Sequence, residues 1–310
     1  MNETMQKYTE YCLNCVVKPC SQKGCPLNND IPAFIKQVKE RNVKEAYKIL
    51  SKTTVLGSVC GRICPHLKQC EGSCVRGIKG EPVQIGEIEA YVFDEALNNK
   101  WYKELEKTEE LKGKKVAVVG GGPAGLTCSA FLTRSGAEVT IYEKYGKLGG
   151  ILEHGIPDFR LSKDVLENTI ESILSLGINV EYNKELGKNI ALQELEKSYD
   201  AIFLSFGANI PSKMNIEGED LEGVFGGNSL LETGKHPDYT GKKVAVIGGG
   251  NVAMDCSRTI KRLGADKVYV IYRRAEKQMP AEIKEIAEAK EEGIEFLFQN
   301  NLVKILGDRK

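Results

Sequence analysis

The sequence lacks a surplus of charge, an apolar leader and any apolar run long enough to span a membrane. Lys+Arg and Asp+Glu both number 43, which excludes a global basic field of the kind that holds nucleic acid or an anionic membrane. The opening residues, MNETMQKYTEYC, contain no apolar core of a secretory signal. No stretch approaches the ~20 apolar residues of a membrane span. We therefore expect a cytoplasmic protein with neither nucleic-acid nor membrane partners.

Cysteine is the residue that the chain does have in quantity, and it is unevenly placed. Eight of the ten cysteines lie between Cys12 and Cys74, while Cys128 and Cys256 stand alone far downstream. Neither lone cysteine has a second cysteine at C-x-x-C spacing, which argues against thioredoxin reductase-like disulfide chemistry and predicts two small core residues. The eight clustered cysteines, without a secretion signal, are more typical of metal ligands than of disulfides.

Three interpretations of the clustered cysteines compete. Structural zinc favours paired C-x-x-C knuckles, and only Cys12/Cys15 has that spacing. Disulfides conflict with the expected compartment. Iron–sulfur ligation suits tight thiolate groups in which a cysteine before proline serves a different cluster from its neighbours, as Cys25-Pro26 and Cys64-Pro65 would. We place iron–sulfur first, zinc second and disulfides last. Between the cysteine groups, residues 31–50 carry apolar side chains at helical spacing, and His66 is predicted to be a solvated loop residue.

The stretch GKKVAVVGGGPAGLTCSAFLTRSGAEVTIYEK, residues 113–144, predicts a dinucleotide-binding unit. Strand-like residues 116–119 lead into G-x-G-x-x-G at Gly120, Gly122 and Gly125, and a helix and a second strand (139–142) follow. The glycines allow a tight turn and close approach of a pyrophosphate, and the helix N-terminus attracts its charge. Glu143 stands where an acid accepts bonds from ribose hydroxyls, which favours a nucleotide without a 2′-phosphate. Further on, we expect a helix closed by Gly177, a strand at 178–182, a buried strand at 199–208 and a loop-rich crossing at 211–236.

The same unit recurs 128 residues later, at GKKVAVIGGGNVAMDCSRTIKRLGADKVYVIYRR. An internal repeat of this kind indicates two dinucleotides rather than one. The third glycine becomes Ala253, a tolerated variant, and the acid is replaced by Arg273-Arg274. Guanidinium groups bind a phosphate bidentately, so the second unit is predicted to prefer NADP(H) over NAD(H). A helix ending at Gly293 and a strand, IEFLFQ, are expected after it.

Several of these motifs together resemble the glutamate synthase small-subunit family. They are C-x2-C-x4-C-x4-C-P-L-x3-I-P, V-C-G-R-I-C-P-x4-C-E-x2-C and P-V-x-I-G-x-I-E between Tyr11 and Asp94, L-G-G-I-L-E-H-G-I-P-D-F-R-L after Glu143, and Y-R-R-x-E-x-x-M-P-A from Tyr272. The cysteine module is shared with dihydropyrimidine dehydrogenase and with ferredoxin:NADP oxidoreductase large subunits. The resemblance implies an α/β flavoprotein with two Rossmann-like dinucleotide-binding folds, preceded by an all-α iron–sulfur domain. The expected domains are residues 1–110 ([4Fe–4S]), 111–240 (FAD) and 241–310 (NADP).

The resemblance also implies two [4Fe–4S] clusters whose ligands cross over between the cysteine groups. One set would be Cys12, Cys15, Cys20 and Glu89, and the other Cys25, Cys64, Cys70 and Cys74. Cys60 is then left over. Counting alone would prefer eight cysteines, with Cys60 as a ligand, whereas the family pattern favours Glu89, which would otherwise read as a surface helix carboxylate.

The nucleotide-binding residues that we expect fall in two sets. For FAD they are Gly120, Gly122, Pro123, Ala124, Gly125, Glu143, Lys144, Gly149, Gly150, Gly155 and Ile156. For NADPH they are Gly248, Gly250, Asn251, Val252, Ala253, Arg273 and Arg274. Because the cofactors carry this chemistry, no catalytic side chain is nominated.

The implied activity is transfer of electrons from NADPH through FAD to the clusters and on to a partner, either a larger glutamate synthase-like catalytic subunit or ferredoxin. An alternative is a non-catalytic iron–sulfur electron-transfer module of a split or truncated protein, and another is a part of a ferredoxin:NADP oxidoreductase. The family returns to a closing flavin segment with a G-D motif, and Gly307-Asp308 lacks the strand context for it. We therefore expect a truncated or split product, or completion by another chain.

Overall fold

The computed structural model describes residues 2–307 as two compact units. The first comprises residues 2–153 and 158–207, and the second comprises residues 154–157 and 208–307. The expected domain limits at 110 and 240 remain predictions. Of the expected Gly307-Asp308 pair, Asp308 lies outside the described residues.

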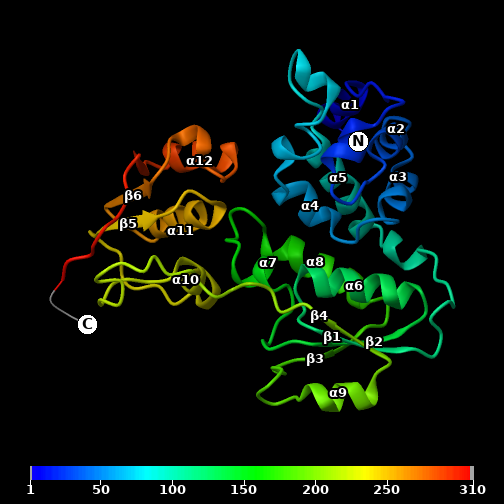
Figure 1. The fold of residues 1–310 in the computed structure, drawn as a ribbon. Helices are drawn as coiled ribbons and strands as arrows, with labels where there is room; N and C mark the ends of the chain where they lie inside the picture. Colours follow the sequence, from blue (N-terminus) through cyan, green and yellow to red (C-terminus); the bar gives the residue numbers. More distant parts are fainter. Residues whose placement is uncertain (1, 308–310) are drawn as a thin grey trace. The chain divides into compact units, whose positions relative to one another are not determined.

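The first unit begins with a helical part that spans the cysteine groups (Figure 1). Its elements are α1 (Glu3–Glu10), the π-turn η1 (Cys20–Gly24), α2 (Ile31–Lys39), α3 (Val43–Leu50), α4 (Gly57–Ile63), the 3₁₀ turns η2 (His66–Lys68) and η3 (Val75–Ile78), α5 (Ile85–Asn98) and η4 (Trp101–Glu104). The apolar spacing of residues 31–50 is confirmed as the pair α2–α3, which buries Phe34 and Leu50 completely. A core of aliphatic and aromatic side chains joins these helices to α5, so the two cysteine groups stand on one scaffold.

A four-stranded parallel sheet follows in the same unit, in the order β3-β2-β1-β4. Its elements are β1 (Lys115–Val119), α6 (Pro123–Arg134), β2 (Glu138–Tyr142), α7 (Ile151–His154), α8 (Lys163–Leu174), β3 (Asn179–Glu181), α9 (Leu192–Ser198) and β4 (Ala201–Leu204). The strand–turn–helix–strand reading of residues 113–144 is confirmed. Parallel strands place the glycine turn and Glu143 at one edge of the sheet, where their carboxyl ends meet.

Strand β4 was expected to be buried, and this expectation is wrong. Phe203 and Leu204 are 38% and 48% exposed. The apolar run is there, but β4 is an edge strand that pairs only with β1 in the described chain. Burial of a strand depends on what covers it, which an apolar run does not reveal.

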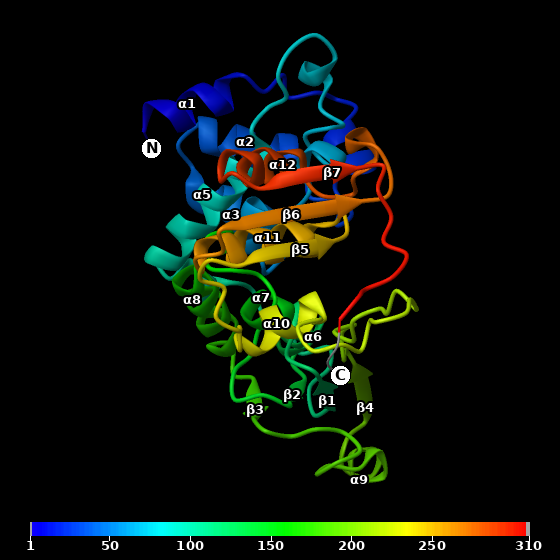
Figure 2. The same cartoon turned by 90° about the vertical axis from the view of Figure 1, so that its left-hand side faces the viewer.

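The second unit repeats the architecture with three parallel strands in the order β5-β6-β7. It contains α10 (Gly227–Thr233), β5 (Lys243–Ile247), α11 (Asn251–Arg262), β6 (Lys267–Tyr272), η5 (Glu276–Gln278), α12 (Ile283–Glu291) and β7 (Glu295–Phe298), and Figure 2 views its strands. Residues 211–236 are mostly loop, as expected, and also contain the short helix α10. The expected helix and strand around Gly293 are confirmed as α12 and β7.

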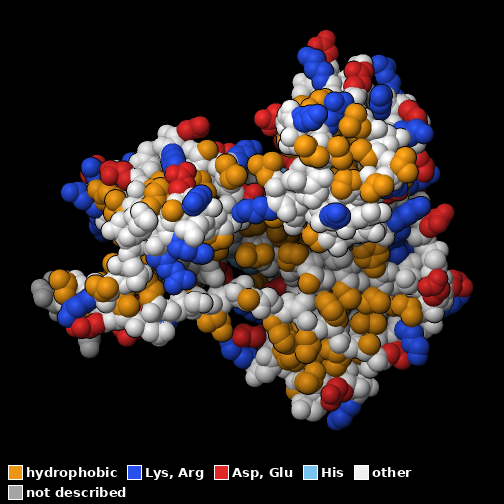
Figure 3. Space-filling view, turned by 45° about the horizontal axis from the view of Figure 1, so that its top comes forward, with side chains coloured by type: hydrophobic (Ala, Val, Ile, Leu, Met, Phe, Trp, Pro, Cys, Tyr) orange, Lys and Arg blue, Asp and Glu red, His pale blue; other side chains and the backbone are white. Residues whose placement is uncertain are grey.

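Charged side chains of both signs are interspersed with apolar and uncharged surface on the face shown in Figure 3. This agrees with the equal numbers of acidic and basic residues. Within residues 2–307, no helix has both the length and the apolar composition needed to cross a bilayer.

Candidate functional site

Four thiols line one cavity of the helical part. They belong to Cys12, Cys15, Cys20 and Cys74, and the apolar side chains of the cavity include Ile31, Ile35, Val83 and Ile85. Cys20 opens the π-turn η1, while Cys74 directly precedes η3. Residues that are more than fifty positions apart in the chain therefore present sulfur atoms to the same space.

The pKa values of Cys20 and Cys12 reflect both burial and the proximity of other thiols. Burial raises the pKa of Cys20 to about 11, and the neighbouring Cys74 and Cys12 add to the rise. Burial also raises the pKa of Cys12, again with contributions from Cys74 and Cys15. Thiols so placed stay protonated at neutral pH, and a metal that replaces the protons would relieve the mutual repulsion of the thiolates.

This placement differs from the ligand sets that the sequence suggested. Cys74 was expected with Cys25, Cys64 and Cys70, but it lies with Cys12 and Cys20. The residue expected in its place, Glu89, lies elsewhere, beside Cys70 and Cys60. Which of these residues bind a cluster, and in which sets, stays a prediction.

A second group gathers around Glu89, which α5 carries. Cys70 is influenced by Cys25 and by Glu89, and burial raises its pKa well above the ordinary value. The Cys60 thiol hydrogen-bonds with Cys64, and this bond together with burial raises its pKa strongly. Four thiols and one carboxyl therefore share the second region.

Glu89 is not a surface carboxylate, because only 6% of it is exposed. Burial raises its pKa well above the usual range, with a further contribution from Cys60. Asn29 Nδ2 donates to Glu89 Oε1 at 3.4 Å, and Thr53 in turn donates to Asn29 Oδ1. A buried carboxyl held in this way is costly unless a cation or a second donor joins it.

His66 also departs from expectation, because it is half-buried rather than solvated. Its Nε2 lies 3.0 Å from the Cys60 carbonyl oxygen, and its ring packs so closely on Gly86 that a Cβ there would lie 2.4 Å from the ring. Next to it, Glu71 Oε1 accepts the Gly86 N–H at 3.0 Å. These contacts fix the loop that carries Cys64 and Cys70.

The side chains of these donor sets are of the type that iron–sulfur clusters use. Among residues 2–307, no three His, Cys, Asp or Glu side chains stand close enough to hold a single metal ion. A cubane cluster sets its ligand sulfurs farther apart than one ion does, and thiolates are its usual ligands. Cys12, Cys15, Cys20 and Cys74 could hold one cluster, and the group around Glu89 could hold another.

The glycine turn of the first unit has the close approaches that its motif predicts. Gly120 has φ +105°, and a Cβ on Gly125 would lie 1.9 Å from the Gly120 carbonyl oxygen. Gly150 lies against Gly122, where an added Cβ would be 2.8 Å from the Gly122 Cα. The backbone at this turn is therefore open to a pyrophosphate, with Pro123, Ala124 and Gly125 opening α6 behind it.

Glu143 closes over this turn from the end of β2. Its Oε2 accepts the Gly121 N–H at 2.7 Å, its Oε1 accepts the Tyr145 N–H at 3.0 Å, and it is 4% exposed. A carboxylate has about four lone-pair sites, so ribose hydroxyls can still donate to it. Lys144 follows it directly, whereas Gly155 and Ile156 belong to the second unit and their role stays a prediction.

The second unit has a similar glycine turn, but two arginines rather than an acid follow its second strand. Gly248 has φ +143°, and Gly250 precedes α11, whose first residues are Asn251, Val252 and Ala253. Arg273 and Arg274 follow β6 and are exposed, with the Arg274 guanidinium 5.6 Å from the Tyr272 ring centre. Exposed guanidinium groups beside an anion-binding turn can bind a phosphate.

Comparison with known proteins agrees with this arrangement. Residues 114–310 match the family model of pyridine nucleotide-disulphide oxidoreductases, and residues 1–101 match that of dihydropyrimidine dehydrogenase domain II, 4Fe-4S cluster. The chain belongs to the pyridine nucleotide-disulphide oxidoreductase family. The two Rossmann-like sheets and the preceding iron–sulfur domain of this family member confirm the expected fold class.

Curated relatives extend the comparison along most of the chain. The glutamate synthase [NADPH] small chain of Escherichia coli is 39% identical over 300 residues, which cover 93% of this chain and 63% of that protein. The NADPH-Fe(3+) oxidoreductase subunit beta of Geobacter sulfurreducens is 40% identical over 298 residues, covering 94% of this chain and 44% of that one. The chain thus spans less than two thirds of these relatives, and the resemblance to glutamate synthase small subunits is confirmed.

Solved structures share the fold at low identity. A 2-naphthoyl-CoA reductase complex covers 92% of this chain and 39% of its own, with a TM-score of 0.58 and 20% identity. FprA from Mycobacterium tuberculosis, in complex with NADPH, covers 64% of this chain and 62% of its own, with a TM-score of 0.56 and 20% identity.

Proposed function

We propose that the chain is an NADPH-dependent oxidoreductase module resembling the glutamate synthase small chain. In this proposal the first glycine turn binds FAD, the second binds NADPH, and the helical part binds two [4Fe–4S] clusters. The flavin, when bound, supplies the conversion of two-electron hydride chemistry into the one-electron steps that the clusters accept.

One observation carries the assignment of the nucleotides: equivalent strands end on opposite charges. After β2, Glu143 has both oxygens on backbone N–H groups at the turn, and a carboxylate there would repel a 2′-phosphate. After β6, Arg273 and Arg274 are exposed and would pair with that phosphate. Selectivity for NADPH over NADH would therefore reside in these two arginines.

The contacts of the thiols favour a revised pair of ligand sets. Cys12, Cys15, Cys20 and Cys74 complete one set without a carboxylate. Cys25, Cys64, Cys70 and Glu89 make the other, and Cys60 remains beside it through its bond with Cys64. Glu89 is preferred to Cys60 because it lies beside Cys70, whereas the Cys60 thiol already hydrogen-bonds with Cys64.

We further propose a larger catalytic subunit as the partner that receives the electrons, with ferredoxin as the alternative. The support is the 39% identity with a protein named a small chain. The domain limits at residues 110 and 240 and the expected nucleotide-binding residues belong to the same proposal.

Anaerobic purification of the chain with flavin and metal analysis tests the proposal. We expect a flavin absorbance band, bleaching by NADPH and much slower bleaching by NADH. Arg273→Ala/Arg274→Ala should lose the preference for NADPH while retaining flavin, because the flavin binds to the other unit. Protein that contains clusters but no flavin would instead be a non-catalytic electron-transfer module, and this result would overturn the proposal.

Iron content distinguishes the ligand sets. Two clusters contain about eight irons, and Cys60→Ser should keep them all, whereas Cys74→Ser and Glu89→Ala should each diminish one cluster signal. Electron paramagnetic resonance of the dithionite-reduced protein would separate the two signals. Loss of a cluster in Cys60→Ser, with Glu89→Ala unaffected, would assign the ligand role to Cys60.

A further inference from the structure

The segment Gln278–Glu282, between the arginine pair and α12, is bound to the glycine turn of the second unit. Ala281 N donates to the Gly249 carbonyl oxygen at 3.0 Å, and Glu282 N donates to Asn251 Oδ1 at 2.9 Å. At its other end, Tyr272 OH donates to the Gln278 carbonyl oxygen at 2.8 Å. Three bonds thus hold five residues of irregular backbone in one place.

The hydrogen bond to the Gly249 carbonyl oxygen determines the direction in which the next N–H points. A peptide group is planar and trans, so the carbonyl of one residue and the N–H of the next point in opposite directions. When Ala281 holds the Gly249 carbonyl, the Gly250 N–H is turned away from the segment. That N–H opens toward the space in which a pyrophosphate would lie against the start of α11.

The first unit uses the same device with an unrelated sequence. There the Gly149 N–H donates to the Gly121 carbonyl oxygen at 2.8 Å, and Gly121 corresponds to Gly249 in the internal repeat. The donor segments, L-G-G in one unit and M-P-A in the other, have no sequence in common. Two unrelated segments thus hold the equivalent carbonyl in the two units. This indicates that the direction of the N–H that follows it matters in both turns.

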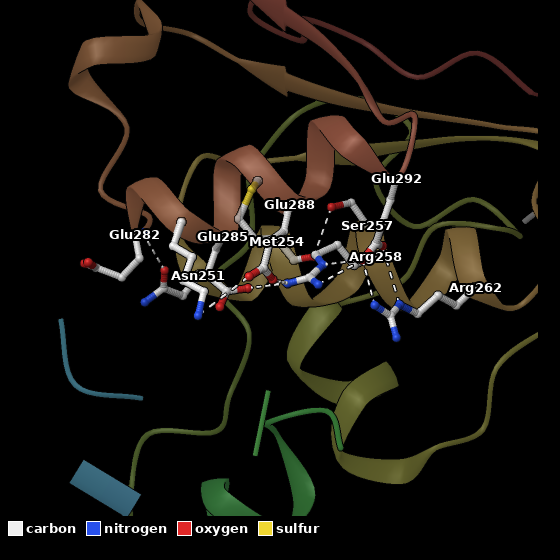
Figure 4. Close-up of polar contacts among 10 residues, drawn as sticks. Asn251, Met254, Ser257, Arg258, Arg262, Glu282, Glu285, Glu288 and Glu292 are labelled. Carbon is white, nitrogen blue, oxygen red and sulfur yellow. Dashed lines mark hydrogen bonds and ion pairs between the residues drawn. The ribbon is translucent and has the colours of Figure 1, made fainter. Parts of the chain in front are cut away.

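In the second unit a side chain also holds the Gln278–Glu282 segment. Asn251 replaces Pro123 of the first unit, so only here can a side chain at this position reach the segment. Arg258, two turns further along α11 and 3% exposed, pairs with three glutamates of α12 and its end (Figure 4). Its distances are 2.6 Å to Glu285, 2.7 Å to Glu288 and 2.9 Å to Glu292. α12 is therefore fixed along α11, with Asn251 at one end and Arg258 at the other.

We propose that Asn251 and Arg258 are positioning residues of the second nucleotide site, which hold the Gln278–Glu282 segment so that Gly250 N–H is aimed at the pyrophosphate. This inference rests on the proposed binding of NADPH to the second unit. Binding of the 2′-phosphate by Arg273 and Arg274 should not depend on these two positioning residues. A loss of affinity that is confined to ligands with a pyrophosphate therefore separates positioning from a general loss of stability.

Isothermal titration of the flavin-loaded chain with NADP⁺ and with adenosine 2′-monophosphate tests the inference. The second probe has the 2′-phosphate but no pyrophosphate. Asn251→Ala should weaken NADP⁺ binding about tenfold, the effect expected when the hydrogen bond from Gly250 N–H to the charged pyrophosphate is lost. Binding of adenosine 2′-monophosphate should change less than about twofold. Arg258→Met should act in the same direction.

Glu282→Pro provides a matched variant on the other side of the bond. Glu282 has φ −69°, which proline adopts, so this change removes the N–H donor, together with the Glu282 side chain, without straining the φ of this residue. Glu282→Ala keeps the donor and reports the loss of the side chain. Because Asn251→Ala and Glu282→Pro break one bond, the double variant should be no weaker than the more severe single variant.

Each outcome decides the matter. Selective weakening of NADP⁺ with coupling between the two variants supports positioning. Equal weakening of both probes, unchanged NADP⁺ binding, or additive effects of the two variants overturns it. A parent chain that binds neither probe overturns the proposed function, and the inference with it.

Discussion

Residues of the same type differ in burial and pKa in this chain, because their surroundings differ. Cys128 and Cys256 occupy equivalent positions of the repeat, and both were expected in the core. Cys256 is 5% exposed, whereas Cys128 is only half-buried, which corrects the expectation for one of them. Burial raises the pKa of Cys256 to about 12, from 9.0, so its thiolate fraction at pH 8 falls roughly a thousandfold.

Alkylation with N-ethylmaleimide at pH 8 should therefore label Cys128 well before Cys256. Peptide mass spectrometry of timed samples measures both sites in one experiment. In denaturant the two rates should converge, since burial is the cause of the difference. Equal rates in the native protein would contradict the burial of Cys256.

Gly125 provides a second test at the scale of one residue. A Cβ there would lie 1.9 Å from the Gly120 carbonyl oxygen, whereas one on Gly146 meets nothing within 4 Å. Gly125→Ala should therefore displace the turn and abolish flavin binding, while Gly146→Ala should retain it. Flavin absorbance relative to protein checks both. The second unit has Ala253 at the matching position, and a Cβ added to Gly248 would lie at an ordinary contact distance, 3.5 Å, from the Ala253 Cβ.

At the scale of elements, helices α11 and α12 depend on one buried guanidinium. Arg258→Met would leave Glu285, Glu288 and Glu292 facing one another, with Glu292 still paired with Arg262 at 2.7 Å and Glu288 with Lys284 at 3.9 Å. Breaking a buried pair costs about 3–5 kcal/mol, whereas Arg262→Met, at a side chain 48% exposed, should cost under about 1 kcal/mol. Hydrogen exchange of the α12 amides compares the two, and equal effects would contradict the assigned burial.

The same pair of helices should respond to acid. Hydrogen bonds from Arg262 and Arg258 lower the pKa of Glu292 from 4.5, against the opposing effect of burial. A carboxyl with a lowered folded-state pKa stabilises the fold above its unfolded pKa and loses that contribution as protons bind. Protection of α12 should thus decline as pH falls below about 4.5 and should do so less in Arg262→Met. Protection that is flat across this range would disprove the linkage.

Sequence patterns predicted elements better than they predicted their surroundings. The period of the apolar residues and the glycine turns gave α2, α3, β1, α6, β5 and α11, because these signals are local. Burial of β4 and the environment of His66 depend on distant neighbours. The Gln278–Glu282 segment belongs to a motif that the sequence showed, but the motif did not reveal its bond to the glycine turn, since the donor that matters is a backbone N–H that any residue but proline provides.

At the scale of the whole molecule, spacing along the chain did not predict which cysteines lie side by side. Eight candidate ligands were named, and their role as ligands stays a prediction. Cys74 lines one cavity with Cys12 and Cys20, while Glu89 lies beside Cys70 and Cys60, and this placement depends on the path of the chain between Cys60 and Cys74. Asn29 and Thr53, which orient Glu89, were missed because an amide and a hydroxyl in helix-rich sequence are unremarkable.

Because Cys12 and Cys74 line one cavity, any group bound to both thiols would also cross-link the chain. A cluster on those thiols would close a loop of more than sixty residues, as a disulfide does, and restrict the unfolded chain by several kcal/mol. Damage by oxygen would then release the N-terminal segment as well as remove a redox centre. Brief exposure to air should accordingly open the segment that carries Cys12, Cys15 and Cys20 to trypsin at Lys23, since the Lys18–Pro19 bond resists trypsin. Loss of colour and the appearance of this cleavage should follow a single time course.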